Sequence, residues 1–214
     1  MLSRTRASLI VAIVIGVFAV GIVATGGAVQ VAWLRFYPGA VTIVVIAIAA
    51  WEHWLWRWSI VQRLPGATRD IRGTWKGELE TFWKDETGTS SARKPVYLVV
   101  RQTASVVSVS LLTNESRSTS SLATVFSDGT TVSLDYLYLN WPDLRVQDKS
   151  RMHHGSASLI VSGMPADRLR GQYWTNRDTK GELDFTSRAL LVAADFDGAA
   201  RIFQNRVTEN ANSR

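Results

Sequence analysis

The sequence predicts a two-helix transmembrane hairpin followed by an all-β domain, a small eight-stranded antiparallel up-and-down β-barrel with a short C-terminal helix. Three observations support this fold class. Two uncharged apolar runs lie within the first 60 residues, an alternation with a period of two begins at Ile71, and only short connections without helical periodicity separate the alternating segments. The expected boundaries are a hairpin at 1–63, a linker at 64–70, a barrel at 71–206 and a flexible tail at 207–214.

The first apolar run, 7–34, contains 28 residues without a charge and would extend roughly 40 Å as a helix, more than the ~30 Å hydrocarbon core of a bilayer. The second run, 36–51, has only 16 uncharged residues. Pro38 suits the first turn of a helix, and a belt of tryptophans extends the span to Trp56, a length of about 28 Å. The turn at 35–39 is too short to hold a domain, so the two runs are expected to form a hairpin.

Basic residues flank the two outer ends of this hairpin, whereas the connecting turn contains only Arg35. By the positive-inside rule, both termini are expected in the cytoplasm. A cleaved signal peptide is the alternative, with 9–23 as its apolar region and 24–28 as its cleavage site. The length of the run and the second apolar segment directly after it disfavour that alternative. Glu52 and His53 lie near the predicted membrane interface, which argues against a role for them in a pore.

The first predicted strand, 71–81, places Trp75 and Leu79 on one face and charged residues such as Lys76 and Glu78 on the other. Because short connections exclude a βαβ plan, the sheet is expected to be antiparallel. Closure into a barrel would hide its edges and leave room for side chains and one small ligand. Seven further strands are predicted at 95–102, 104–113, 117–127, 130–141, 152–163, 167–176 and 180–188.

A short helix is expected after the last strand, at 197–203, with Asp197 as its N-terminal cap. The stretch 195–198 also resembles the start of a calcium-binding loop. It lacks the third oxygen ligand and the glutamate that ends such a loop, so the capping interpretation is favoured.

Composition removes several classes of function. The absence of cysteine excludes disulfides, thiolate zinc sites and cysteine nucleophiles. The first 63 residues contribute +4 of the net charge of +6, so no basic surface for a DNA or RNA polymer is expected. His153 and His154 are adjacent on a predicted strand and point to opposite faces, so they cannot chelate one metal ion. Without a recognisable catalytic motif, we expect no catalytic residues, no metal and no cofactor.

Three segments combine aromatic rings with hydrogen-bonding side chains. In 136–142 both faces of the predicted strand are apolar or aromatic, with Tyr136 and Tyr138 together on one face. The other two segments are 150–155 and 171–181. Flat rings, hydroxyl and amide groups, and arginine forks near strand ends are suited to binding bases and phosphates. The alternative is that the aromatic side chains fill the barrel while the arginines face water.

The order of these segments after a membrane hairpin resembles a known family. The matching residues are Gly73-Thr74-Trp75-Lys76-Gly77, Tyr136 to Pro142, His154-Gly155 and Gly171 to Gly181. Over 7 to about 203, the chain is similar to the two-transmembrane, β-strand-rich effectors of bacterial cyclic-oligonucleotide-based anti-phage signalling (CBASS).

This resemblance implies a receptor function rather than an enzymatic one. The cytoplasmic barrel would bind a cyclic dinucleotide made by a partner nucleotidyltransferase during phage infection. Binding would drive oligomerisation of the hairpins in the bacterial inner membrane, disrupt the lipid bilayer and lead to abortive infection. The nucleotide must then bind the active arrangement more tightly than the resting one.

The resemblance also directs attention to eight candidate ligand-binding residues. Aromatic side chains would stack on or wall the ligand, namely Tyr136, Tyr138 and Trp174. Hydrogen bonds would come from Asn140, Thr175 and Thr179, and phosphate contacts from Arg177 and Arg151.

Two rival functions remain open at this stage. The segment Gly73-Thr74-Trp75 resembles the opening motif of lipocalins, so the barrel could be a membrane-tethered carrier of an apolar small molecule. The same Trp75 could equally plug one end of the barrel as a structural residue. A packed barrel with an exposed apolar patch would instead indicate a purely protein-binding role.

Overall fold

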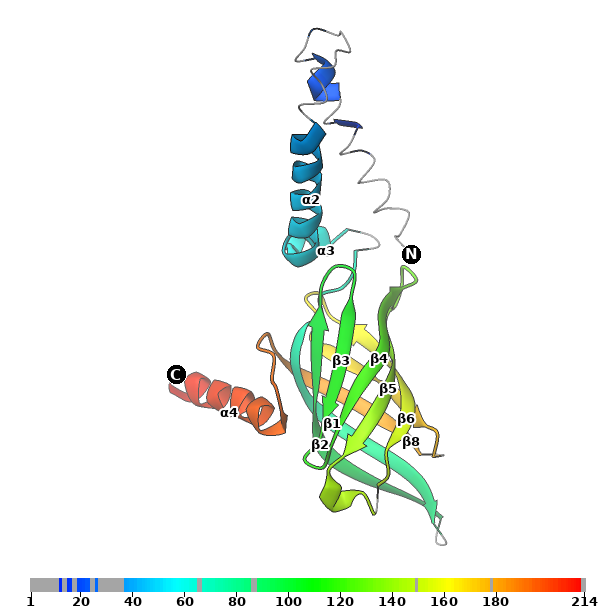
Figure 1. The fold of residues 1–214 in the computed structure, drawn as a ribbon. Helices are drawn as coiled ribbons and strands as arrows, with labels where there is room; N and C mark the ends of the chain where they lie inside the picture. Colours follow the sequence, from blue (N-terminus) through cyan, green and yellow to red (C-terminus); the bar gives the residue numbers. More distant parts are fainter. Residues whose placement is uncertain are drawn as a thin grey trace. The chain divides into compact units, whose positions relative to one another are not determined.

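The computed structural model describes residues 12, 15–16, 19–23, 26, 37–64, 67–85, 88–148, 150–177 and 179–212. They belong to two compact units, Met1–Trp56 and Arg57–Arg214 (Figure 1).

In the first unit, helix α2 spans Tyr37–His53 and agrees with the second predicted apolar helix. Several of its large apolar side chains, including Ile43 and Ile46, are exposed. Most of the first predicted helix, 7–34, lies outside the described residues. In the part of the chain that the structure describes, none of the helices combines the length and the apolarity needed to span a membrane. The predicted transmembrane hairpin therefore stays a prediction.

Two short helices follow α2 along the chain. The 3-10 helix η2 spans Leu55–Arg57, and helix α3 spans Ser59–Gln62.

The second unit is a closed antiparallel barrel of eight strands, which confirms the predicted up-and-down topology (Figure 1). Each strand pairs with the next along the chain, and β8 pairs with β1 to close the wall. A 3-10 helix, η3 (Leu144–Val146), lies in the connection between β5 and β6. The strands are β1 (Gly73–Asp85), β2 (Gly88–Gln102), β3 (Val107–Leu112), β4 (Ser116–Ser127), β5 (Val132–Pro142), β6 (His153–Ser162), β7 (Arg168–Thr175) and β8 (Lys180–Ala189).

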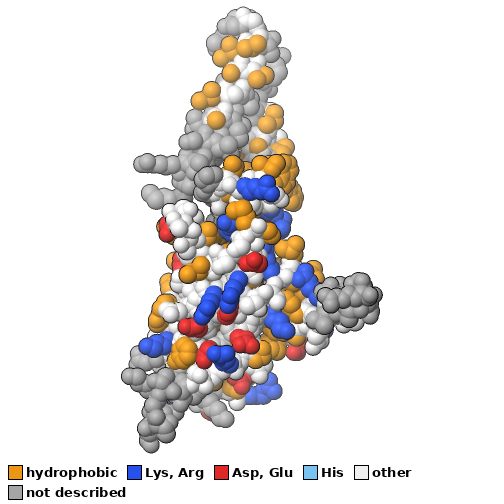
Figure 2. Space-filling view, turned by 180° about the vertical axis from the view of Figure 1, so that it is seen from behind, with side chains coloured by type: hydrophobic (Ala, Val, Ile, Leu, Met, Phe, Trp, Pro, Cys, Tyr) orange, Lys and Arg blue, Asp and Glu red, His pale blue; other side chains and the backbone are white. Residues whose placement is uncertain are grey.

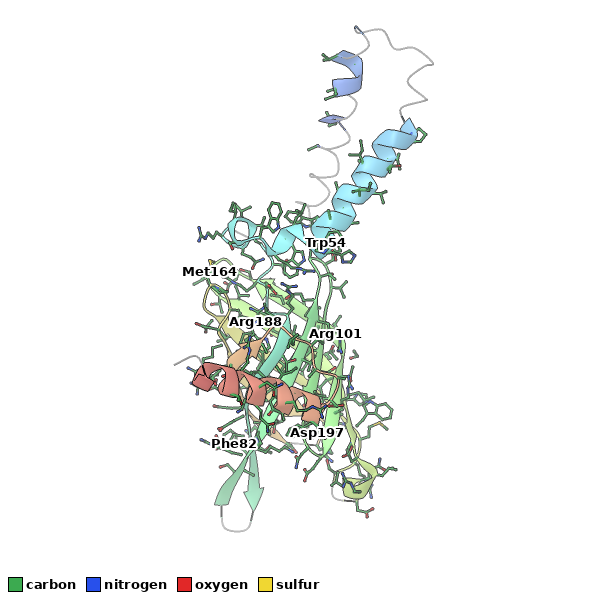
Figure 3. All side chains as sticks on the ribbon, turned by 90° about the vertical axis from the view of Figure 1, so that its left-hand side faces the viewer. Trp54, Phe82, Arg101, Met164, Arg188 and Asp197 are labelled. Carbon is green, nitrogen blue, oxygen red and sulfur yellow. The ribbon has the colours of Figure 1, made fainter. Side chains whose placement is uncertain are left out.

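Strands β1 and β2 are longer than predicted. They pair from Gly73↔Val100 to Asp85↔Gly88, whereas the sequence predicts strands only at 71–81 and 95–102. Pairing of β1 with β8 ends at Phe82↔Lys180, so the remainder is a two-stranded ribbon that projects beyond the closed wall (Figure 3). Such a ribbon has no interior face to bury, so its residues lack the alternation that would reveal a strand.

The outer wall carries ion pairs between neighbouring strands. Arg168 on β7 binds Asp184 on β8 at 2.5 Å, and this contact lowers the pKa of the Asp184 carboxyl. Arg93 on β2 binds Glu80 on β1 at 2.8 Å. Basic and acidic side chains consequently lie next to one another on this face of the barrel (Figure 2).

The interior is packed with apolar side chains at the end where β1 begins. Trp75 is completely buried, and its indole Nε1–H donates a hydrogen bond to the Ile71 carbonyl at 2.8 Å. The guanidinium of Arg188 lies 5.3 Å from the centre of the Trp75 ring. Phe185 and Leu98 are also fully buried in the same cluster. These contacts support the interpretation of Trp75 as a structural plug.

The described part of the predicted linker, 67–70, is held by two glutamine side chains. The Gln62 amide donates to the Thr68 carbonyl and accepts from the backbone N–H of Asp70, both at 2.9 Å. Gln102 donates to the Arg69 carbonyl at 2.8 Å and accepts from the Ile71 N–H at 2.9 Å. These side-chain amides satisfy backbone groups as a paired strand would, so this segment is ordered against its neighbours.

Helix α4, Phe196–Asn212, packs its N-terminal half against the outside of the barrel, and its C-terminal end points away from the barrel (Figure 1). Its Phe203 ring stacks on Tyr97 of β2, with ring centres 5.8 Å apart. The N-terminal cap is Asp195, whose Oδ1 accepts from the Gly198 N–H at 2.7 Å, and not Asp197 as predicted. The helix also continues through 207–212, where the sequence predicts a flexible tail, because no glycine or proline follows Gly198 to interrupt it.

We expect the Trp75→Ala substitution to lower the free energy of unfolding by about 3–5 kcal/mol, because it leaves a cavity in a fully packed barrel end. Chemical denaturation followed by far-ultraviolet circular dichroism would measure the loss. The matched control is Trp141→Ala on the outer face of β5, where the side chain is 56% exposed and the loss should stay below about 1 kcal/mol. Equal losses for the two variants would contradict the plug assignment.

Candidate ligand-binding site

A cavity of about 180 Å³ opens at the end of the barrel opposite Trp75. Leu79, Leu111 and Leu183 form its apolar walls. Its mouth is lined by residues of the strands and of their connections, all of which carry hydroxyl, amide or basic groups. These residues are Thr81, Lys94, Thr113, Ser116, Ser118, Asn140, Ser150, His153, Thr175, Arg177 and Thr179.

Three tyrosines complete the inner part of the cavity, and their hydroxyl groups differ in hydrogen bonding. Tyr173 and Thr81 share a hydrogen bond of 2.7 Å between their hydroxyl oxygens. The Tyr136 hydroxyl is buried and has no hydrogen-bond partner among the described residues. Burial raises the pKa of Tyr136, Tyr138 and Tyr173, so their hydroxyl groups are neutral at physiological pH and able to donate as well as accept.

Gly155 on β6 makes room for the ring of Tyr138. A Cβ atom at position 155 would collide with the ring and hydroxyl of Tyr138 and with the carbonyl oxygen of Trp174. Gly155 and Tyr138 are partners in the β5–β6 register, so the ring crosses over the backbone of the neighbouring strand. Glycine at this position therefore determines where one wall of the cavity lies.

Arg177 joins two connections at the mouth. It follows β7, and its guanidinium donates to the carbonyl of Arg151 at 3.2 Å and to the hydroxyl of Ser150 at 3.4 Å, both in the β5–β6 connection. The Thr175 hydroxyl accepts from the backbone N–H groups of Arg177 and Thr179 at 3.2 and 3.3 Å. These hydrogen bonds hold the backbone of Arg177 next to the cavity that its side chain lines.

Two further basic side chains line the mouth. Lys94 on β2 lies 3.8 Å from the Glu115 carboxylate, and both side chains are substantially exposed. Burial lowers the pKa of His153, whose Nδ1 lies 3.0 Å from the Arg151 carbonyl oxygen. Positive charge at the rim of the cavity therefore comes from Arg177 and Lys94, whereas the lowered pKa of His153 favours its neutral form. The described residues include no group of three or more His, Asp or Glu side chains placed to hold a metal ion.

The structure brings six of the eight predicted site residues to this cavity. They are Tyr136, Tyr138, Asn140, Thr175, Arg177 and Thr179. Asn140 is buried, and its side-chain oxygen accepts a hydrogen bond from the Ser118 hydroxyl at 2.8 Å.

The other two predicted residues do not line this cavity. Trp174 lies on the outer wall beside Leu122 and Leu137, with 44% of its surface exposed. It cannot wall a ligand here, because neighbouring residues of a strand point to opposite sides and Thr175 faces inward. The Arg151 side chain lies with Trp141 in a separate surface depression, and its contribution to the mouth is the carbonyl that Arg177 binds.

Sequence reasoning missed Tyr173, Lys94 and His153 as cavity residues. The signal for Tyr173 was present, since it shares a strand face with Leu169 and Thr175. The sequence does not place Lys94 on the inward face of a strand, because Lys94 precedes the predicted start of its strand at 95.

The cavity belongs to a part of the chain that matches a known family. The model of the Cap15 cyclic dinucleotide receptor domain matches residues 67–187, more than half of the chain. The chain belongs to the Cap15 family. The matched range includes every residue that lines the cavity. It confirms the predicted kinship with CBASS effectors that contain an eight-stranded receptor barrel.

A curated Cap15 relative supports this assignment. The CD-NTase-associated protein 15 of Staphylococcus schleiferi is 27% identical over 154 residues, which cover 72% of this chain and 80% of the relative.

The His153 pKa provides a test of this Cap15 site. Because burial holds the folded-state pKa of His153 below the ordinary histidine value of 6.5, the folded protein favours the neutral imidazole. This contribution to stability is present above the pKa of the unfolded chain and is lost as the pH falls through that value toward the folded pKa. An NMR titration, with the resonance assigned through His153→Asn, should give a pKa below 6.5. A pKa at or above 6.5 would contradict the burial of this ring.

Proposed function

We propose that this barrel binds a cyclic dinucleotide second messenger made by a partner nucleotidyltransferase, and that the chain acts as a CBASS effector. One observation carries the proposal: within the range matched by the receptor family, the cavity is aromatic in its interior and basic at its mouth. A cyclic dinucleotide has the complementary arrangement, with flat bases attached to a ring that contains two phosphates. Aromatic side chains favour bases, and basic side chains favour phosphates.

Arg177 is the principal phosphate ligand in this proposal. Its present partners are a carbonyl and a hydroxyl, both neutral acceptors at 3.2 and 3.4 Å. A phosphate can replace them with shorter, charge-assisted hydrogen bonds, which are roughly twice as strong as neutral ones. Lys94 approaches from a different strand of the barrel and is suited to the second phosphate.

The N-terminal unit has a separate role in the proposal. We infer that 1–63 forms a two-helix hairpin in the bacterial inner membrane, with the N-terminus and the barrel in the cytoplasm. Supporting features are the uncharged run at 7–34 and the exposed apolar side chains of α2. Ligand binding would drive oligomerisation of the hairpins, and the disrupted membrane would end the infected cell and the phage cycle with it.

A lipocalin-like carrier of an apolar molecule is the second candidate. The leucines of the cavity wall favour it, but an apolar ligand would leave the Arg177 and Lys94 groups at the mouth without a specific role. The carrier function predicts that ligand binding does not depend on Arg177, whereas the cyclic-dinucleotide function predicts that it does.

A thermal-shift titration of the full-length protein with cyclic di- and trinucleotides tests the proposed function directly. A ligand at a hundred times its dissociation constant should stabilise the fold by about 2.7 kcal/mol, which raises the melting temperature measurably. Selective stabilisation by cyclic dinucleotides is the expected result. A folded protein that none of these compounds stabilises would contradict the proposal and favour the apolar-carrier function.

The Arg177→Ala variant should bind the stabilising dinucleotide about 10- to 100-fold more weakly, the effect of losing charge-assisted hydrogen bonds. Isothermal titration calorimetry would measure the change. The melting temperature of the free protein should stay nearly the same, because Arg177 is exposed. The control is Arg170→Ala on the outer face of β7, where the arginine pairs with Glu182 at 3.5 Å. An affinity loss of the same size in the control would contradict the assigned site.

A further inference from the structure

We propose that the barrel takes up only one of the two bases of its ligand, that the Tyr136 hydroxyl reads the edge of that base, and that the second base stays at the mouth. This inference rests on the proposed function, since it assumes a cyclic dinucleotide as ligand. It predicts a receptor that is selective for one base and tolerant of the other.

The first argument is the size of the cavity. Its volume of about 180 Å³ is close to that of an engineered protein cavity of about 150 Å³ that binds benzene. One planar base fits such a space, whereas two bases with their riboses do not. The cavity cannot extend along the barrel, because Trp75, Leu134 and Phe185 fill the interior behind it.

The second argument is the distribution of charge. Arg177 follows β7 and Lys94 lies within β2, and both side chains line the mouth and are at least partly exposed. The core cluster behind the cavity consists of apolar and tyrosine side chains. A phosphate moved into that interior would lose its hydration without a positive partner, so both phosphates stay at the mouth. Only a base, projecting from the phosphate ring, can enter.

The third argument is the Tyr136 hydroxyl. Among the described residues of the cavity, this hydroxyl is buried without a partner, whereas the Tyr173 hydroxyl shares a hydrogen bond with Thr81 and the Asn140 amide oxygen accepts one from Ser118. A buried hydroxyl without a partner destabilises the free protein. The polar edge of a base in the cavity supplies the missing partner. A base with a mismatched edge leaves the hydroxyl unpaired, and this is the physical basis of selectivity.

Six ligands distinguish uptake of one base from uptake of two. They are the three symmetric dinucleotides of adenine, guanine and uracil and the three mixed ones, each titrated calorimetrically against the full-length protein. If one base enters, a mixed ligand can present its better base, so its affinity falls only about twofold below that of the better symmetric ligand. If both bases are read, the mixed affinity is the geometric mean, which is tenfold weaker when the two symmetric ligands differ a hundredfold.

The hydroxyl has its own test. Tyr136→Phe should weaken binding of the preferred ligand by about tenfold. The ratio between its affinity and the affinities of the other symmetric ligands should therefore become smaller. The melting temperature of the free variant should not fall, because the removed hydroxyl has no partner. The control is Tyr97→Phe, a buried tyrosine that stacks on α4 outside the barrel. It should leave binding unchanged.

The possible results separate this inference from the proposed function. Binding with geometric-mean affinities would overturn single-base uptake, and equal affinities across the six ligands would overturn base reading; both would leave the receptor function intact. Unchanged binding by Tyr136→Phe would overturn the role of the hydroxyl. Absence of binding by all six ligands would overturn the proposed function and this inference with it.

Discussion

The narrow interior of an eight-stranded barrel is the constraint on which the rest of this structure depends. Such a barrel has room for side chains or for one small ligand, so packing and binding compete for the same inward positions. Strand β5 shows how the space is divided. Leu134 belongs to the packed core, Tyr136 and Tyr138 form the cavity, and Asn140 lies at the rim. The division is possible because Trp75 and its neighbours close the other end without help from a ligand.

The two ends of the barrel also differ in the hydrogen bonds and ion pairs that hold the neighbouring segments. At the Trp75 end, Gln62 and Gln102 bind the backbone of the linker, and Arg188 binds Asp70 at 3.0 Å with little exposure to solvent. At the mouth, Arg177 holds the β5–β6 connection through longer hydrogen bonds to neutral acceptors. An anionic ligand competes readily with the hydrogen bonds that Arg177 makes to these neutral acceptors. The structure therefore combines a firmly held linker with a mouth that a phosphate can rearrange.

The sequence predicted the barrel well because alternation is a direct consequence of strand geometry. It also placed Tyr136, Tyr138 and Asn140 on one face, since positions two apart share a side. The same rule separates two neighbours in 171–181, because Tyr173 lies on the inward face with Thr175, whereas the predicted site residue Trp174 lies on the outer wall. The projecting β1–β2 ribbon could not be predicted, because the sequence at 82–94 shows no alternation of polar and apolar residues. The contribution of Lys94 depends on barrel closure, which a local pattern cannot show.

The unpaired Tyr136 hydroxyl destabilises the free barrel but offers a hydrogen-bonding group to a ligand. An apolar residue in place of Tyr136 would pack the cavity floor without an unsatisfied hydroxyl, and a purely structural barrel would have no reason to retain that group. Gly155 has a structural role beside it, since a side chain there would collide with the Tyr138 ring. The unpaired Tyr136 hydroxyl costs stability in the free protein. In the proposed function, the free energy gained when a ligand base pairs with this hydroxyl would help to bias the protein toward its active arrangement, because a ligand acts as a signal only if it binds that arrangement more tightly.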